Sequence, residues 1–149
     1  MADEAVFAVW QAEEVVRRKA ADLISIYPGK HGGISRALRI SKLAAEGGVA
    51  CHVGSNLEWD IATAAMCQLA VAAANVDVAR HPVDILGPLY YSDRPARQAV
   101  SFSGGFVQTP PGPGLGIHLD RAEIEELSAR STRWGRTSQR YESHPTPLE

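Results

Sequence analysis

The chain lacks the features that would place it in a membrane, on nucleic acid or among disulfide scaffolds. Its only cysteines, Cys51 and Cys67, form no C-x-x-C pair, so we expect both to be reduced, buried packing residues. The longest apolar run, Leu69–Ala74, is far too short to span a bilayer, and no apolar leader opens the chain. With 15 basic and 17 acidic residues the net charge is -2, and no basic cluster alternates with aromatics. We therefore expect a cytoplasmic protein with no nucleic-acid or membrane partner.

Nucleotide and zinc motifs are also missing. The five histidines show no H-x-x-x-H or H-x-E spacing, which disfavours a zinc site. His31 stands where a Walker A motif would have its hydroxyl residue, and the glycines of residues 111–116 do not lie between a strand and a helix. At 149 residues the chain has the length of one domain but falls short of the roughly 250 residues of a complete eight-stranded α/β barrel.

What the first half does contain is strands alternating with helices, which predicts an α/β fold with a parallel sheet. Ser55 and Glu58 have the S-x-x-E form of a capping box, which predicts a helix start directly after them. The expected elements are the helix Trp10–Ala21, the strand Leu23–Tyr27, a helix from Gly32-Gly33 to a Gly47-Gly48 cap, the strand Val49–Val53, the helix Trp59–Ala74 and the strand Val83–Leu86.

The pattern changes after Tyr91. The segments Ala99–Phe102 and Phe106–Thr109 flank Ser103-Gly104-Gly105 and predict a hairpin. Residues 110–116, rich in Pro and Gly, must form a loop. We expect a last helix over Arg121–Arg130 with Asp120 as its N-cap, and a frayed tail from Ser131. Residues 1–120 and 121–149 are accordingly treated as two regions.

Lys30 is the first candidate for chemistry. It follows a β-branched strand and precedes Gly32-Gly33 and a helix, so a cation stands at the carboxyl end of a strand, where parallel α/β folds meet their ligands. His31 beside it is a candidate substrate contact. Asp84 lies inside a predicted strand, where a carboxylate is costly unless it is paired, for instance with Arg80, or sits at the sheet's mouth. The alternative interpretation of each of these residues is an ordinary solvated or ion-paired side chain without a functional role.

Five segments together resemble the muconate lactonizing enzyme and mandelate racemase family of the enolase superfamily. Ala2-Asp3-Glu4 resembles the end of that family's fifth barrel strand, and Gly29–Ile34 the sixth strand and its loop. Gly54–Glu58 is similar to the loop after the seventh strand, Asp84–Leu89 to the acidic residue and G-P-L of the eighth, and Gly112–Asp120 to the closing segment. The likeness covers nearly the whole chain, in the family's order.

The resemblance implies a partial (β/α) TIM-type barrel, about strands 6 to 8 with their helices, plus a carboxyl-terminal hairpin and helix. It also implies a divalent metal, usually Mg²⁺, held by three carboxylates. In such enzymes a base removes the proton α to a substrate carboxylate and the metal stabilises the resulting enolate. A fixed cation is needed because that proton is so weakly acidic.

Matched residue by residue, Asp3 falls on the third metal ligand, Lys30 on the sixth-strand acid/base lysine, and Asp84 on the eighth-strand acid that contacts substrate or intermediate. The candidate substrate contacts are His31 and Asn56. The histidine and aspartate dyad of the mandelate racemase type is missing, because Asn56 and Tyr27 stand at those positions. The muconate lactonizing type is therefore favoured. Nothing corresponds to the capping domain, to the K-x-K strand, or to the first two metal ligands.

The resulting hypothesis is the carboxyl-terminal part of a Mg²⁺-dependent isomerase, racemase or dehydratase that acts on a small carboxylic acid and is inactive as this chain alone. The alternative is a noncatalytic remnant or partner-binding half-barrel. We expect Lys30 and Asp84 to lie at the same end of one sheet. A cut barrel also predicts self-association or a complementing amino-terminal half, with Ile24, Ile26, Cys51 and Val53 as exposed barrel-interior residues.

Overall fold

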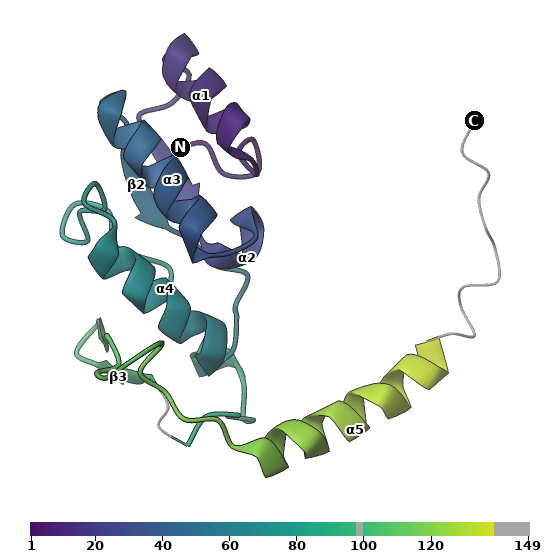
Figure 1. Ribbon diagram of the computed structural model, residues 1–149. Coiled ribbons are helices and arrows are strands. Elements are labelled where there is room, and N and C mark those ends of the chain that lie inside the picture. The colour runs from purple at the N-terminus through teal and green to yellow at the C-terminus, as the bar shows by residue number, and fades with distance from the viewer. Residues whose placement is uncertain (98–99, 139–149) are drawn as a thin grey trace, which may run out of the picture.

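Two short parallel strands lie at the centre of the fold, with helices packed against them (Figure 1). The computed structural model describes residues 1–97 and 100–138. The elements in chain order are α1 (Val9–Arg18), β1 (Leu23–Ile26), α2 (Pro28–His31), α3 (Ile34–Glu46), β2 (Ala50–Val53), α4 (Asp60–Ala72), the 3-10 turn η1 (Gly87–Tyr90), β3 (Ser101–Ser103), β4 (Phe106–Gln108) and α5 (Arg121–Ser138).

Each central strand is extended sideways by one further parallel contact. β1 pairs with β2 in parallel, with Ile24 opposite Cys51. Ala2 forms a parallel bridge with Ile24, and Val76 forms one with Cys51. Four segments therefore lie side by side in the order in which the chain meets them, which is the arrangement of consecutive strands in an α/β barrel. The parallel sheet expected from the strand and helix alternation is confirmed.

The apolar face of the sheet is buried under the helices. Ile24 and Ile26 of β1 and Cys51 and Val53 of β2 are all 0% exposed, so the expectation that a cut barrel exposes them is wrong. Alternate residues of a strand point to opposite faces, and these four belong to the face that α1, α3 and α4 cover. They share a core cluster with Ala12, Ala37, Ile40, Ala44, Ala64, Met66 and Leu69.

Both cysteines are free and buried, as expected. Burial raises the pKa of the Cys51 thiol and of the Cys67 thiol to about 11. Neither thiol is therefore ionised near neutral pH, and both act as packing groups.

The helix boundaries differ from the predicted ones where a local conformation intervenes. α1 ends at Arg18 rather than near Ala21 because Lys19 adopts a left-handed conformation with φ 51°. The S-x-x-E segment does not cap a helix, because Leu57 has φ 59° and α4 begins only at Asp60. Instead Glu58 Oε2 accepts the Asn56 amide at 2.8 Å and closes a turn in the loop.

No strand forms over Val83–Leu86, which corrects the prediction for that segment. Only one ladder hydrogen bond joins it to β2, from the Asp84 amide to the Val53 carbonyl at 2.8 Å. Directly after it, Gly87 packs so closely on the backbone of Leu57 and Glu58 that a Cβ there would overlap them. The segment is therefore drawn into a 3-10 turn, η1, before a strand can extend.

A buried ion pair fixes the segment between η1 and the hairpin. Asp60, in the first turn of α4, is 0% exposed. Arg94 donates to both of its carboxylate oxygens, at 2.7 and 2.6 Å. The Val100 amide donates to Asp60 Oδ1 at 3.2 Å. One carboxylate thus stabilises the start of α4 and holds two loop positions that lie 34 and 40 residues further along the chain.

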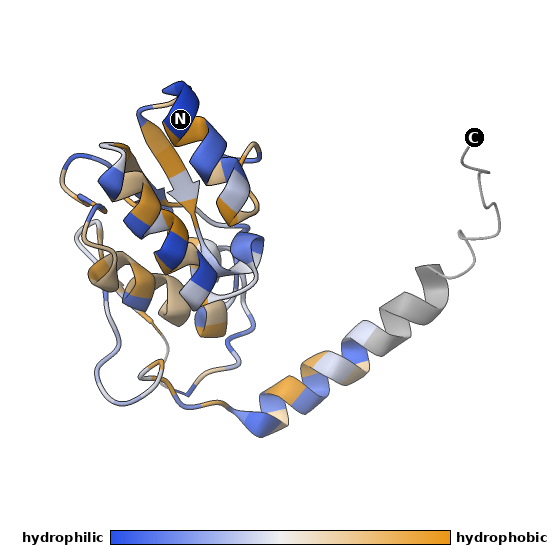
Figure 2. Ribbon diagram, turned by 45° about the horizontal axis from the view of Figure 1, so that its top comes forward, coloured by the Kyte–Doolittle hydropathy of each residue, from blue (hydrophilic) through white to orange (hydrophobic). Residues whose placement is uncertain are grey.

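The carboxyl-terminal part forms a hairpin and then a helix. β3 and β4 pair antiparallel around Gly104 and Gly105, as predicted, and both glycines have positive φ. Asp120 Oδ1 accepts the Ala122 and Glu123 amides, which confirms the N-cap. The helix does not stop at Arg130 but runs to Ser138, which corrects the tail expected from Ser131, and the rest of that tail lies outside the described residues. It extends away from the other helices (Figure 1), and the coloured part of α5 mixes hydrophilic and hydrophobic residues (Figure 2).

No helix within residues 1–97 and 100–138 is long and apolar enough to cross a membrane.

We predict that Arg94→Ala lowers the free energy of unfolding by about 3 kcal/mol, because it leaves the Asp60 carboxylate buried without its counter-ion. The matched control is Arg97→Ala, which removes a pair between Arg97 and Asp120 that is largely exposed, 70% and 30% for the two side chains. Exposed pairs contribute about 1 kcal/mol or less. Urea denaturation of both variants measures the difference, and equal losses would contradict the role given to Asp60.

Candidate functional site

Polar side chains gather on the sheet face opposite the apolar core, at the carboxyl end of β1 and β2. Ser25 alternates with Ile24 and Ile26 and lies opposite His52 of β2. Tyr27 follows directly after β1, and Gly54 directly after β2. A Cβ at Gly54 would overlap Ser25 Oγ and touch the Tyr27 ring, so only glycine lets these two side chains pack against the end of β2. Ligands of parallel α/β folds bind at this end.

Lys30 lies at the centre of this polar face and is fully engaged there. Its ammonium group donates to Asp3 Oδ1 at 2.6 Å, to the Ser25 carbonyl at 2.7 Å and to the Asp3 carbonyl at 3.2 Å. The side chain is 1% exposed. An ammonium group has three N–H donors, and each has an acceptor here.

Asp3 is the partner that remains accessible, with its side chain 36% exposed. Burial raises the pKa of the Asp3 carboxyl, but the hydrogen bond and charge of Lys30 outweigh that effect and hold the pKa below its usual range. Asp3 is therefore ionised at neutral pH. The bridge at Ala2 and the ion pair at Asp3 together fasten the amino-terminal segment to β1.

Tyr27 links this ion pair to the loop after β2. Its hydroxyl donates to Asn56 Oδ1 at 3.2 Å, and the Lys30 ammonium lies 4.9 Å from the centre of its ring. That distance is within the range of a cation–π contact. Burial raises the pKa of the Tyr27 phenol, and the nearby carboxylates of Asp3, Glu4 and Glu58 raise it further.

Asp84 reaches the same end of the sheet from the other side. Its amide bonds to the Val53 carbonyl at 2.8 Å, and one carboxylate oxygen accepts the Ser55 hydroxyl at 3.2 Å. Lys30 and Asp84 thus both lie at the carboxyl end, as expected. Between them, burial lowers the pKa of His52, and the charge of Asp84 partly opposes that shift.

His31 lies behind the polar face rather than on it. The side chain is 2% exposed, and its Nδ1 lies 2.9 Å from the Phe7 carbonyl. A carbonyl only accepts, so Nδ1 carries the proton in that bond. Burial lowers the pKa of His31, and the charge of Lys30 adds to the effect. His31 forms the wall of a cavity of about 650 Å³ between α3 and residues 7–9, which Arg36 and Arg39 also line.

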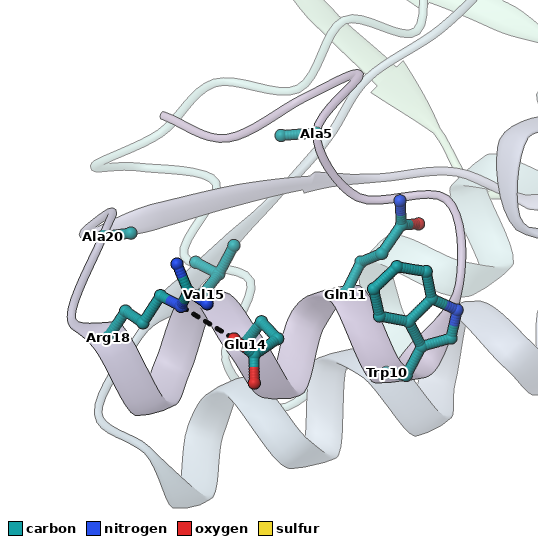
Figure 3. A pocket seen from close by; sticks show the side chains of 7 residues that line it. All are labelled: Ala5, Trp10, Gln11, Glu14, Val15, Arg18 and Ala20. Carbon is teal, nitrogen blue, oxygen red and sulfur yellow. Dashed lines mark hydrogen bonds and ion pairs between the residues drawn. The ribbon is translucent and has the colours of Figure 1, made fainter.

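A second cavity, of about 550 Å³, lies beside α1 (Figure 3). Its charged groups are paired with each other, because Arg18 donates to Glu14 at 2.7 Å, and the Gln11 side-chain oxygen accepts the amides of Phe7 and Ala8. The remaining wall is formed by Ala5, Trp10, Val15 and Ala20. This cavity offers no reactive group.

Four of the five sequence-predicted residues therefore meet at one end of the sheet: Asp3, Lys30, Asn56 and Asp84. His31 is separated from them by its burial. Ser25, Tyr27 and His52 belong to the polar face but were not singled out as functional. Period-two alternation with Ile24 and Ile26 is the signal that could have found Ser25 and Tyr27.

The residues described here do not fit a magnesium site by themselves. No group of three or more His, Cys, Asp or Glu side chains converges within residues 1–97 and 100–138. Mg²⁺ requires near-octahedral oxygen ligands, and the one carboxylate that the resemblance assigns to it, Asp3, is paired with Lys30.

Comparison with known proteins defines the class of this fold and site. The family described as "Enolase C-terminal domain-like" matches residues 1–123, so the chain belongs to that family. Muconate cycloisomerase 1 of Rhodococcus opacus is 36% identical over 125 residues, which cover 84% of this chain and 33% of the relative. The L-Ala-D/L-Glu epimerase of Bacillus subtilis is 38% identical over 117 residues, covering 78% of this chain and 31% of the relative.

Solved structures agree. The 2-chloromuconate cycloisomerase of Rhodococcus opacus 1CP superposes with a TM-score of 0.79 at 29% identity, covering 85% of this chain and 33% of that one. The substrate-liganded L-Ala-D/L-Glu epimerase of Bacillus subtilis superposes with a TM-score of 0.73 at 36% identity, and the match covers 80% of this chain and 33% of that one. The chain thus spans about a third of the length of the relatives it matches, and corresponds to their carboxyl-terminal portion.

We predict that Tyr27→Phe removes a tyrosine ionisation that lies above the ordinary range of a phenol. The pKa of Tyr27 is raised above its value of 10.0 in an unfolded chain. Stability from this phenol is therefore fully present below pH 10 and is lost as the pH rises through the folded-state pKa. Spectrophotometric titration of the phenolate measures the step. Tyr90→Phe, at a side chain 65% exposed, is the control, and a late step that survives in Tyr27→Phe would contradict the assignment.

Proposed function

We propose that this chain is the carboxyl-terminal part of an enolase-superfamily isomerase that removes the proton α to a carboxylate, contributing about strands 6 to 8 of the catalytic barrel. The observation that carries the proposal is the order of the polar groups. Asp3 follows the parallel bridge at Ala2, Lys30 follows β1, and the Asp84 amide bonds to the last residue of β2, so all three lie at one end of the sheet. Consecutive βα loops supply the active sites of such barrels in this way.

In the complete enzyme we assign Lys30 as the acid/base residue and Asp84 as the acid that contacts substrate or intermediate. Asn56, on the exposed loop after β2, is the proposed substrate contact, whereas His31 is buried behind the polar face and is no longer assigned that role. A base must present a lone pair to the proton it removes. Lys30 can do so only after its ammonium group loses a proton, and with that proton one of its three present hydrogen bonds.

The substrate class is a small carboxylic acid. The relatives support this class by their names, which include muconate cycloisomerases and an L-Ala-D/L-Glu epimerase. The reaction of the complete enzyme is a cycloisomerisation, an epimerisation or a dehydration. The loops that would contact the rest of the substrate, and so distinguish these reactions, correspond to the two thirds of the relatives outside this match.

Magnesium is the proposed cofactor of the complete enzyme only. This chain contributes one candidate ligand, Asp3, and no step is assigned to a metal here. The second candidate function is a noncatalytic half that binds a partner chain. The full engagement of Lys30 with Asp3 and Ser25 favours it, because all three N–H donors of the ammonium group are occupied by the protein itself.

We predict that the chain alone shows no proton exchange at the α-carbon of any carboxylic acid, and that exchange appears when the amino-terminal two thirds of a muconate cycloisomerase is supplied with Mg²⁺. Losing metal stabilisation costs several kcal/mol of transition-state stabilisation, enough to abolish measurable turnover. Deuterium incorporation from D₂O into candidate acids, such as muconolactone or an Ala-Glu dipeptide, followed by NMR, measures it.

The controls for this experiment are Lys30→Ala and Lys42→Ala in the mixed halves. Lys42 is an exposed lysine on α3, so its replacement leaves exchange unchanged. Exchange by the chain alone would refute the need for a second half. Undiminished exchange in the Lys30→Ala mixture would remove Lys30 from the mechanism, and a mixture that forms without exchange would support the noncatalytic alternative.

We also propose that the chain self-associates or binds a complementing half. Ala2 is paired with β1 on one side, and an open sheet edge is a template for pairing with another chain. Large apolar side chains are exposed as well, including Phe106 at 81% and Trp10 at 63%. Light scattering over a range of concentrations is expected to give a mass above the 16.0 kDa of one chain. A monodisperse monomer with a cooperative melt would contradict this.

A further inference from the structure

We infer that in this chain the Lys30 ammonium is itself the cation of the Asp3 carboxylate, so that Asp3 is a structural counter-ion and not an open ligand for a divalent metal. This inference concerns the chain as it stands. It does not depend on the proposed function of a complete enzyme.

The geometry of the Lys30 ammonium group leaves none of its donors without an acceptor. Its three acceptors are Asp3 Oδ1, the Asp3 carbonyl and the Ser25 carbonyl, at 2.6, 3.2 and 2.7 Å. Two of them belong to the amino-terminal segment and the third to β1. The group therefore joins two neighbouring segments of the sheet with all of its donors. A lysine that merely reached solvent would show neither the burial nor the complete set of partners.

The second step is the charge balance. The Lys30 side chain is 1% exposed, and a buried ammonium without a counter-ion is strongly unfavourable. Asp3 is the carboxylate that pairs with it. Any cation that drew the Asp3 oxygen away would leave the ammonium buried and unpaired, and would also bring a second positive charge close to it. Binding of a divalent cation is therefore opposed twice, by the lost pair and by repulsion.

The third step is the set of oxygen ligands. Within the part of the chain that the structure describes, no three His, Cys, Asp or Glu side chains gather around a point. Mg²⁺ bound through a single protein carboxylate would keep nearly all its waters and gain little. The Lys30 ammonium is already desolvated by folding. A weakly bound Mg²⁺ therefore does not displace it from the Asp3 carboxylate.

Lys30 also acts as a positioning residue for Tyr27. The ammonium lies 4.9 Å from the centre of the Tyr27 ring, whose hydroxyl reaches Asn56 at 3.2 Å. Fixing Lys30 by Asp3 therefore fixes a chain of contacts that ends at the loop after β2. A metal held at Asp3 would orient the carboxylate but would supply no such contact to the ring.

The experiment uses NMR of the lysine ammonium groups in the full chain. The sequence contains three lysines, at positions 19, 30 and 42, so the signals are readily assigned with Lys30→Met and Lys42→Met. We expect one ammonium signal, that of Lys30, to exchange slowly with water, while the exposed Lys19 and Lys42 exchange fast. Asp3→Asn is expected to speed the Lys30 exchange at least about tenfold, because a charge-assisted hydrogen bond is lost.

Magnesium chloride at millimolar concentration is the metal probe, with potassium chloride at equal ionic strength as the control for screening. We expect neither salt to displace the Lys30 signal, and Mg²⁺ to add nothing to the melting temperature beyond the potassium effect. A specific Mg²⁺-dependent shift of the Lys30 signal, or a specific rise in melting temperature that Asp3→Asn abolishes, would overturn the inference.

Stability gives an independent readout. Lys30→Met is expected to lower the melting temperature by about 5 °C or more, whereas Lys42→Met leaves it nearly unchanged. Equal melting temperatures for the two variants would overturn the inference, as would a Lys30 signal that exchanges as fast as those of Lys19 and Lys42. Should Lys30→Met fail to fold, the exchange rates of the wild-type chain and of Asp3→Asn decide alone.

Discussion

The ion pair between Lys30 and Asp3 is the constraint on which the polar end of this fold depends. A two-stranded parallel sheet has little ladder energy of its own, and on one side of β1 the contact is the bridge at Ala2 with its two backbone hydrogen bonds. The buried ammonium of Lys30 adds to this contact by joining Asp3 to the Ser25 carbonyl. The sheet end, the Tyr27 ring and the loop after β2 take their positions from it.

In the carboxyl-terminal half, the buried Asp60 carboxylate fixes the positions of the loop segments in the same way. Both anchors are charges taken out of water, which is costly unless every donor or acceptor is satisfied, and both are satisfied from segments far apart in the chain. Lys30 reaches back 27 residues to Asp3, and Asp60 reaches forward 34 residues to Arg94. Such long-range pairs fix where irregular segments lie, which the short strands and the isolated bridges alone could not do.

Much of this fold follows from local sequence signals, and what does not follow has identifiable causes. The period-two apolar positions at Ile24 and Ile26 and the glycines of the hairpin specify elements that form as expected. Val83–Leu86 has the composition of a strand, but close packing of Gly87 on the Leu57–Glu58 backbone, a tertiary contact, bends the chain away. The sequence also assigns the four core strand residues to the wrong face, because a strand's alternation identifies two faces without saying which one the helices cover.

In the candidate site, too, the sequence predicts some features and tertiary contacts decide the others. Motif order placed Asp3, Lys30, Asn56 and Asp84 at one end of the sheet, whereas burial separated His31 from them. What no motif could give is the partner of each charge. The sequence suggests Lys30 as a base because it does not show that the ammonium group is paired. It suggests Asp3 as a metal ligand for the same reason, because it does not show that the carboxylate is paired. In the folded chain each satisfies the other at 2.6 Å. A complete enzyme that used both groups for catalysis would have to bring to Asp3 a cation that binds the carboxylate more strongly than the Lys30 ammonium does, and would have to give that ammonium another partner. That exchange of partners is needed in addition to the metal ligands and strands that lie outside this match, so Asp3 and Lys30, paired as they are here, are one part of what the proposed function requires.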